Sequence, residues 1–338
     1  MVSETINAIE EIYGCNPTDL PEEVLTSAKP LILRGLVSDW PIVRTAAQGP
    51  GAVLDRLREY YRGKPVSLFL GTAEIEGRFF YNDDMTGFNF VQMEASLGDV
   101  FDKLIEFEHQ EKSPAFYVGS TAIDTWLSGF RQDNDLNLDT HKPLTSIWIG
   151  NKSRVAAHFD SPNNIACCVL GRRRFTVFPP EQVANLYTGP HDLTPAGQQI
   201  SMVDFSAPDL QKYPKFSEAL AASQVAELEP GDAIFLPSMW WHHVEALDAI
   251  NVLVNYWWSR EPAYLGSPAD ALNHAMLAIK ELPLAQRQAW QSMFNQHVFE
   301  PPEGGTDHIA EHAKGRLGNI DEVMARRLRA ELLNHLKQ

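Results

Sequence analysis

Two short segments of the chain carry residue types that bind metal ions. The first, Ala156-Ala157-His158-Phe159-Asp160, sets an imidazole and a carboxylate two positions apart among apolar residues, as in a β-strand. Because side chains alternate faces along a strand, His158 and Asp160 lie on one surface. A histidine from another strand would complete a two-histidine, one-carboxylate site, which suits a non-haem Fe(II) oxygenase. The pair also occurs by chance, so the rest of the chain must decide.

The second segment is Trp240-Trp241-His242-His243. It follows a short apolar strand and a proline, an arrangement that would deliver a histidine to the mouth of a β-barrel, where ligands commonly bind. Adjacent residues face opposite ways in extended structure, so only one of the two histidines can join the first pair. The alternative is that both histidines merely form hydrogen bonds within an aromatic cluster.

A basic strand lies between these segments. The sequence GRRRFTVFPP begins at Gly171, and strand alternation places Arg173 on the same face as the apolar Phe175 and Val177. An arginine on an interior face needs an anionic partner, and a guanidinium suits a carboxylate. The alternative is that the three arginines are exposed to solvent and offset part of the negative charge of the protein.

The overall composition is that of a soluble globular protein, with 338 residues of which 44% are hydrophobic and 21% charged. The net charge of -16 disfavours a surface devoted to nucleic acid or anionic membrane. Cys167 and Cys168 are adjacent and are poor disulfide partners, which together with the lone Cys15 predicts a reducing, cytoplasmic location. No signal peptide and no membrane span are visible, so we expect no membrane partner.

Short strands dominate the middle of the chain. Helices are expected over 18–28, 52–62 and 96–108, and early strands over 30–35, 66–70 and 78–81. Further strands are expected at 115–118, 145–149, 154–160, 165–170, 173–178, 225–228, 233–236, 243–247 and 250–258. An insertion over about 181–222 mixes a short helix with loop. This spacing predicts a β-sandwich or barrel over about 115–258 rather than βαβ units.

The last part of the chain, 261–338, has a helical pattern and is expected to form a region distinct from 1–260. Ser267 and Pro268 are typical of a helix start, a second helix is expected over 284–297, and a third begins at Asn319. The third carries an apolar stripe made of Ile320, Val323, Met324, Leu328 and Leu332. We expect this region to pack on the β region or on a second subunit, which would give a homodimer.

In combination, the motifs resemble those of a known family. His158-x-Asp160, GRRRFTVFPP, PGDAIFLPSMWWHHVE and VNYW, in this order, are similar to the JmjC/cupin-like 2-oxoglutarate oxygenases. Within them they resemble the bacterial cupin-like proteins related to the asparaginyl hydroxylase of hypoxia-inducible factor. The earlier PLILRGLVSDWP is similar to that group's N-terminal signature, and the resemblance covers about residues 28 to 260. It implies a mainly β protein with a double-stranded β-helix (jelly-roll, cupin) core, flanking helices and a C-terminal helical region.

The resemblance also implies the metal and co-substrate residues. His158, Asp160 and His242 would bind Fe(II), because the first histidine of the family's WWHH is the ligand. Arg173 would bind the distal carboxylate of 2-oxoglutarate, at a position where the family has lysine, and Tyr117 would hydrogen-bond the same carboxylate.

Other positions match polar and aromatic residues around that site. Asn164 and Asn255 would line the iron and 2-oxoglutarate site, whereas Val155 stands where the family has a threonine hydroxyl. Trp257 would form an aromatic wall, and Tyr81 would lie at the mouth where substrate binds. Glu245 is a candidate for fixing the metal-binding imidazoles.

The implied activity is hydroxylation with O2, coupled to decarboxylation of 2-oxoglutarate to succinate and CO2, on a protein or peptide side chain or a small molecule. N-demethylation is the same chemistry on a different bond. One alternative is a cupin-type isomerase or hydrolase with zinc or manganese, which would not need the clamp of Arg173 and Tyr117. Another is a non-catalytic binding module, against which the intact set of metal-binding residues argues.

Overall fold

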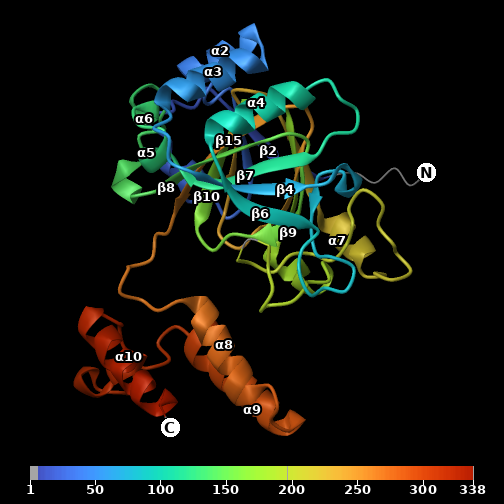
Figure 1. Cartoon of the computed structure of the whole chain (residues 1–338). Helices are drawn as coiled ribbons and strands as arrows, with labels where there is room; N and C mark the ends of the chain where they lie inside the picture. Colours follow the sequence, from blue (N-terminus) through green and yellow to red (C-terminus); the bar gives the residue numbers. More distant parts are fainter. Residues whose placement is uncertain (1–6, 196, 338) are drawn as a thin grey trace. The chain divides into compact units, whose positions relative to one another are not determined.

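The computed structural model describes residues 7–195 and 197–337 (Figure 1). The chain forms two compact units, residues 1–259 and residues 260–338. Within the described residues, every β-strand belongs to the first unit. The two units are therefore described separately.

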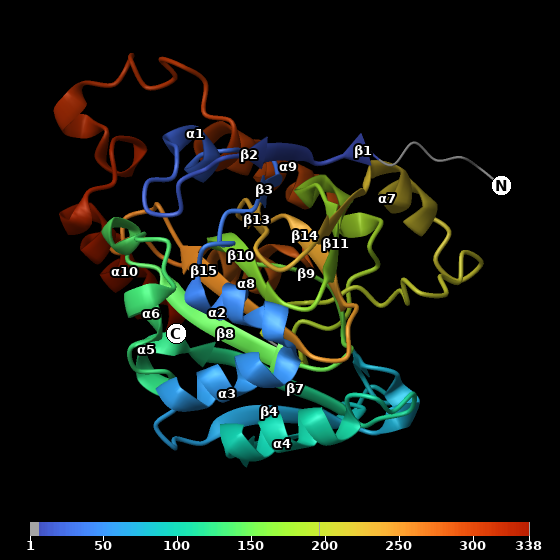
Figure 2. The ribbon, with the colours of Figure 1, turned by 90° about the horizontal axis from the view of Figure 1, so that it is seen from above.

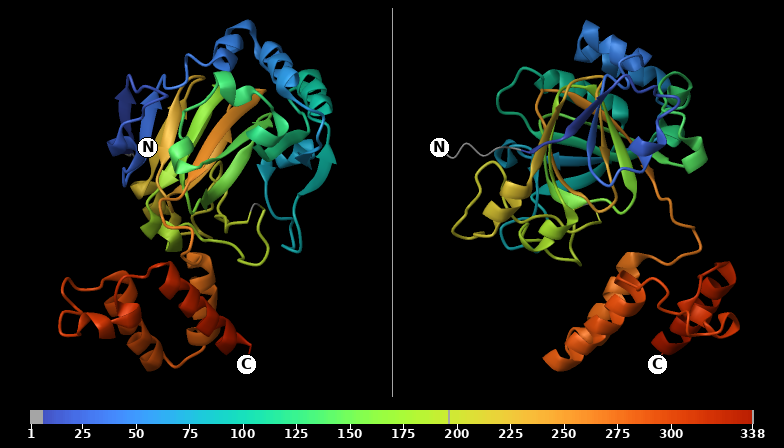
Figure 3. Two further views of the ribbon diagram at one scale, coloured as in Figure 1. Left: turned by 90° about the vertical axis from the view of Figure 1, so that its left-hand side faces the viewer. Right: turned by 180° about the vertical axis from the view of Figure 1, so that it is seen from behind.

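The first unit contains two β-sheets. The six-stranded sheet has the order β1 (Asn7–Ala8), β12 (Gln224–Leu228), β11 (Arg173–Phe178), β14 (Trp241–Ala246), β9 (Arg154–Phe159) and β5 (Arg78–Phe79). The nine-stranded sheet has the order β2 (Glu10–Tyr13), β3 (Leu31–Arg34), β13 (Ala233–Leu236), β10 (Asn163–Leu170), β15 (Asn251–Trp258), β8 (Leu144–Gly150), β7 (Ala115–Ala122), β4 (Val66–Gly71) and β6 (Phe90–Ala95). The neighbours are antiparallel except for the parallel pairs β1/β12, β2/β3 and β5/β9. The predicted mainly β jelly-roll core with flanking helices is confirmed (Figure 3).

Strand alternation divides the apolar residues between two layers. On β10, Ala166 and Cys168 belong to the core between the sheets, where they pack with residues such as Phe175. Ile165 and Cys167, which alternate with them along the strand, belong to the larger core on the other face of the same sheet. β10 is buried on both faces, so it reads as a continuous apolar run rather than an alternating one.

Helices cover the outer face of the nine-stranded sheet. α2 (Pro41–Thr45), α3 (Pro50–Tyr60) and α4 (Leu97–Phe107) lie along it (Figure 2). The amphipathic spacing predicts α3 and α4 to within two residues. The remaining helical elements of this unit are short: α1 (Glu22–Leu25), α5 (Ile123–Trp126), α6 (Phe130–Asp133), α7 (Phe216–Ala222), and the 3₁₀ turns η1 (Ala46–Gln48), η2 (Ala73–Ile75), η3 (Asp139–His141) and η4 (Pro180–Ala184).

Two predicted elements in this unit are wrong in extent. The helix expected over 18–28 is only α1, which begins after Pro21 and has no side-chain cap. The strand expected over 78–81 ends at Phe79, because the chain then turns into a hairpin in which the backbone N–H of Asn89 donates to the carbonyl of Phe80 at 3.0 Å. β6, which pairs with β4, was not predicted.

The second unit is helical. It contains α8 (Pro268–Ile279), α9 (Leu284–Phe294), the π-helical turn η5 (Asn295–Phe299), the 3₁₀ turns η6 (Glu311–Ala313) and η7 (Gly315–Leu317), and α10 (Glu322–Leu336). Ser267 occupies the N-cap position of α8 but makes no side-chain cap, whereas the Asp321 side chain caps α10 by accepting from the backbone N–H of Met324. On α10, Val323 and Leu332 are exposed, and their use in a homodimer stays a prediction. None of the described helices is long and apolar enough to cross a membrane.

Candidate metal centre and co-substrate cavity

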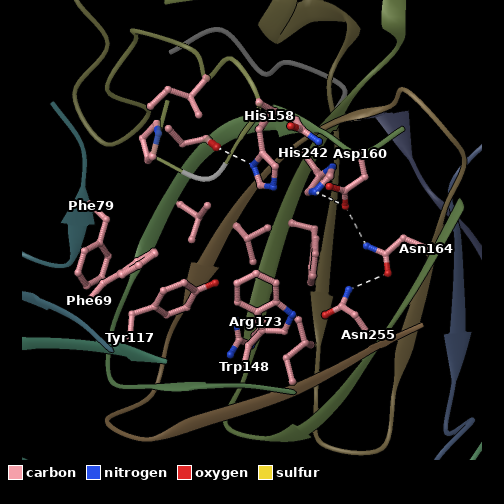
Figure 4. Close-up of a pocket in the computed structure, with 18 of the residues that line it drawn as sticks. Phe69, Phe79, Tyr117, Trp148, His158, Asp160, Asn164, Arg173, His242 and Asn255 are labelled. Carbon is pink, nitrogen blue, oxygen red and sulfur yellow. Dashed lines mark hydrogen bonds and ion pairs between the residues drawn. The ribbon is translucent and has the colours of Figure 1, made fainter. Parts of the chain in front are cut away.

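Three side chains converge at the end of the six-stranded sheet. β9 and β14 are antiparallel neighbours in which His158 lies directly opposite His242, and Asp160 follows two residues after His158 (Figure 4). Each of the three offers one ligand atom within 4.8 Å of the others. The Nε2 of His242 lies 3.6 Å from Oδ2 of Asp160. Two imidazoles and a carboxylate at this spacing fit a divalent first-row metal.

Backbone carbonyls orient both imidazoles. Nδ1 of His158 donates to the carbonyl of Ala156 at 3.0 Å, and Nδ1 of His242 donates in the same way to Trp240 at 3.0 Å. A carbonyl can only accept, so each Nδ1 carries the proton and each Nε2 keeps a free lone pair for a metal. The expectation that Glu245 fixes the imidazoles is wrong, because its carboxylate lies 3.6 Å from the guanidinium of Arg174 instead.

The two adjacent histidines face opposite sides of β14. His242 is buried at the cavity, where desolvation and the neighbouring His158 lower its pKa to about 4 and favour the neutral form that binds metals. His243 points to the other side and packs against Phe205 with ring centroids 4.4 Å apart. The choice of His242 rather than His243 as the third member of the cluster therefore agrees with the geometry.

Asp160 is held by a network from β10 and β15. Nε1 of Trp257 donates to its Oδ2 at 3.0 Å, and the Nδ2 of Asn164 approaches the same oxygen at 3.4 Å. Asn255 in turn donates to Oδ1 of Asn164 at 2.7 Å. Asn255 and Trp257 share one face of β15, and Asn255 opposes Ala166 on β10. Sequence reasoning placed these residues around the site but missed that they act on the carboxylate.

Replacing Trp257 by phenylalanine should weaken metal binding about 10- to 100-fold, the usual effect of losing a hydrogen bond to a ligand. The change keeps an aromatic ring but removes the N–H that orients Asp160. Titration of the metal-free protein with Fe(II) under argon measures the affinity. Trp148→Phe is the matched control, because the Trp148 Nε1 has no hydrogen-bond partner among the described residues. Equal affinities for the two variants would contradict the role given to Trp257.

Arg173 enters the cavity from β11. The preceding Gly171 has φ +72°, and a Cβ there would lie 2.3 Å from Oδ1 of Asn251, so the tight turn into the strand requires glycine. Alternation buries Arg173, whereas the partly exposed Arg174 pairs with Glu227 at 2.6 Å.

No carboxylate in the described part of the chain pairs with Arg173, and its Nε has no hydrogen-bond partner. Burial lowers its pKa from the ordinary value, yet a guanidinium stays charged at neutral pH. Tyr117 lies beside it on the cavity wall (Figure 4). Desolvation raises the pKa of Tyr117 to about 12, so its hydroxyl remains a neutral donor. A buried cation without a partner is a site for an anion.

The cavity that joins these groups has a volume of about 100 Å³. His158, Asp160 and His242 lie on its wall together with Arg173, and Val155, which replaces a hydroxyl of the family, is part of the lining. The sequence did not predict its aromatic side, which comprises Phe69, Phe79, Phe90 and Trp148. It also missed Pro195, Gln198 and Ile200, which the insertion after β11 contributes. These residues come from separate strands and a loop with no common motif.

Tyr81 does not belong to the cavity lining of the structure. It is buried behind the residues that line the cavity, where it packs with two of them, Ala156 and Ile200. Its hydroxyl donates to the carbonyl of Leu193 at 2.7 Å. Tyr81 thus ties the hairpin after β5 to the loop that supplies Gln198, and its predicted contact with substrate stays a prediction.

Tyr81→Phe should accelerate amide hydrogen exchange at Gly189 and Met202 roughly fivefold, which corresponds to the loss of a hydrogen bond worth about 1 kcal/mol. Both amides hold the base of the loop, by donating to Ile200 and Tyr187. Tyr60→Phe is the matched control, because the buried Tyr60 hydroxyl has no hydrogen-bond partner in residues 7–195 and 197–337. Unchanged exchange in Tyr81→Phe would show that the hydrogen bond does not hold the loop.

Comparison with known proteins agrees with this geometry. Residues 17–264 match the model of the cupin-like domain family. Among curated proteins, the chain is 32% identical to human HSPB1-associated protein 1 over 303 residues, which is 83% of this chain and 58% of that protein. It is 31% identical to lysine-specific demethylase JMJ31 of Arabidopsis thaliana over 191 residues, 54% of this chain and 34% of that protein.

A third relative is lysine-specific demethylase 8 of Xenopus tropicalis, which is 23% identical over 263 residues, 76% of this chain and 54% of that protein. The chain spans between 34% and 58% of the length of these three relatives. The comparisons therefore concern part of each of those proteins rather than the whole.

Proposed function

On the premise that the chain belongs to the cupin-like domain family and to its JmjC-type oxygenases, we propose that it is an Fe(II)- and 2-oxoglutarate-dependent hydroxylase. The proposed substrate is a protein or peptide side chain or a small molecule. Hydroxylation of an N-methyl group would give demethylation, the activity in the names of two of the relatives. A cytoplasmic location, a homodimer and the absence of nucleic-acid and membrane partners remain predictions from the sequence.

One observation carries this proposal. Arg173 is 2% exposed and has no anionic partner among the described residues, and it lies in the same cavity as His158, Asp160 and His242. A dicarboxylate that reaches from a metal to a buried guanidinium satisfies both ends of this cavity. A metal-dependent isomerase or hydrolase would not need Arg173 and Tyr117 as a carboxylate clamp.

Each residue then has a definite task. His158, Asp160 and His242 would hold Fe(II), which when bound lets O2 oxidise 2-oxoglutarate to succinate and CO2 and a substrate C–H bond to C–OH. Arg173 binds and orients the distal carboxylate, and Tyr117 donates a neutral hydrogen bond to it. Trp257 and Asn164 keep Asp160 directed at the metal. The aromatic side of the cavity excludes water from the reacting groups.

Calorimetric titration under argon tests the proposal. We expect one Fe(II) per chain, followed by one 2-oxoglutarate whose binding depends on the metal. 2-Oxobutyrate, which lacks the distal carboxylate, should bind at least about 100-fold more weakly, since it leaves the buried charge of Arg173 unpaired. Metal binding without any binding of 2-oxoglutarate would favour the alternative of a cupin-type metal protein with another activity.

A further inference from the structure

β6 is the outermost strand of the nine-stranded sheet (Figure 1). It pairs with β4 from Phe90 opposite Gly71 to Ala95 opposite Val66, without a register shift. On its other edge, the N–H and C=O groups from Val91 to Glu94 have no backbone partner within the described residues. A free strand edge is a template for a further strand.

This edge lacks the features that usually protect one. Val91 and Met93 are 62% and 45% exposed, on a strand whose intervening Gln92 and Glu94 are also exposed. Natural edge strands are shielded by lysine, proline, a bulge or a covering loop. β6 contains no lysine, no proline and no bulge, and Glu94 is its single charged residue.

The edge leads directly into the catalytic cavity. Phe90, the first residue of β6, lines the cavity. Its ring packs against Phe69 at 5.1 Å and Phe79 at 5.4 Å, both of which line the same cavity. A chain paired with β6 therefore passes the aromatic side of the cavity within one or two residues.

The stretch of chain that contains β6 is acidic. Residues 74 to 99 contain six acidic side chains and one basic, a net charge of -5 from one minus six. The six are exposed, and comprise Glu74, Glu76, Asp83, Asp84, Glu94 and Asp99. Of these, Glu76 lies 3.7 Å from Arg154. The single basic residue, Arg78, is compensated by Asp204 at 3.5 Å and stacks over Phe80. A basic occupant is favoured, whereas a second copy of this edge would bring like charges together.

We propose that β6 docks an extended, basic peptide segment of the substrate, which adds to the sheet as a further strand and places one side chain in the cavity. Main-chain hydrogen bonds supply affinity in this mode of recognition, and alternate side chains supply specificity. Val91 and Met93 provide apolar contacts, and the acidic surroundings select lysine and arginine. This inference rests on the proposed function and assigns it a peptide rather than a small-molecule substrate.

Fluorescence anisotropy on the full-length, metal-free protein tests the docking edge apart from catalysis. The probes are two labelled dodecapeptides, three repeats of Lys-Thr-Lys-Val and three repeats of Glu-Thr-Glu-Val. We expect the lysine peptide to bind and the glutamate peptide to bind at least about tenfold more weakly. The double variant Val91→Lys/Met93→Lys should weaken the lysine peptide about tenfold or more, by protecting the edge and repelling the probe.

Two further variants keep the result interpretable. Val91→Thr/Met93→Thr removes the apolar contacts without adding charge and should also weaken binding, while β propensity is kept. Val183→Lys is the matched control, a valine 46% exposed on η4, and should bind like the wild type. Binding that is absent, or equal in the wild type and both double variants, would overturn the proposal.

A wild-type dimer in light scattering that both double variants dissociate would also overturn it, because the edge would then bind a second copy. Uncoupled succinate release, measured on the same variants after they are loaded with Fe(II), reports separately on the proposed function. Its loss in the wild type would refute the hydroxylase but not the docking edge.

Discussion

His158→Ala abolishes 2-oxoglutarate-dependent succinate production and leaves a folded protein. The variant removes one of three groups whose ligand atoms lie within 4.8 Å of one another. His242 and Asp160 remain, but two ligands do not fix a metal with the open positions that the chemistry needs. Succinate formation without added substrate, together with iron content after dialysis, measures the effect. Asp160→Ala is expected to behave in the same way.

His191→Ala is the control for this result, because His191 is an exposed histidine outside the cavity lining. It should retain wild-type iron content and turnover. A thermal melt that matches the wild type shows that His158→Ala is folded. Unchanged turnover in His158→Ala would remove the assignment of the metal centre.

Arg173→Met raises the 2-oxoglutarate concentration needed for half-maximal turnover by about 100-fold or more, the size expected when one partner of a buried charged pair is removed. The same change should stabilise the ligand-free protein by about 1–3 kcal/mol, because it replaces an unpaired buried charge by an apolar side chain of similar length. Denaturant unfolding without 2-oxoglutarate and a kinetic titration with it measure the two opposite effects.

Arg174→Met is the matched control on the same strand. Arg174 is partly exposed and pairs with Glu227, so its loss should change stability by about 1 kcal/mol or less and leave the 2-oxoglutarate requirement unchanged. A loss of iron in Arg173→Met that parallels the loss of activity would show that Arg173 supports the fold rather than the co-substrate.

Strand alternation explains how much of the site could be anticipated from the sequence. The i, i+2 spacing of His158 and Asp160, the opposite faces of His242 and His243, and the inward side of Arg173 all follow from a period of two. The register that sets His158 opposite His242 does not follow from it, since pairing between strands more than 80 residues apart depends on the whole sheet.

Other features depend on tertiary contacts that no local pattern reports. The indole of Trp257 was expected only to form a wall. Its N–H reaches Asp160 because β15 pairs with β10 so that Trp257 lies opposite Asn164. Tyr81 was expected at the mouth, but the hairpin after β5 turns it toward Leu193. β6 carries side chains exposed on both faces and therefore lacks the alternation that marks a half-buried strand.

The proposed function requires that this cavity couples O2 to 2-oxoglutarate at iron. Turnover of the Fe(II)-loaded protein under ¹⁸O2, with mass analysis of the succinate, tests it most directly. We expect the wild type to form 2-oxoglutarate-dependent succinate that carries one ¹⁸O atom, and His158→Ala to form no succinate. Absence of succinate, or succinate without the label in the wild type, would contradict it.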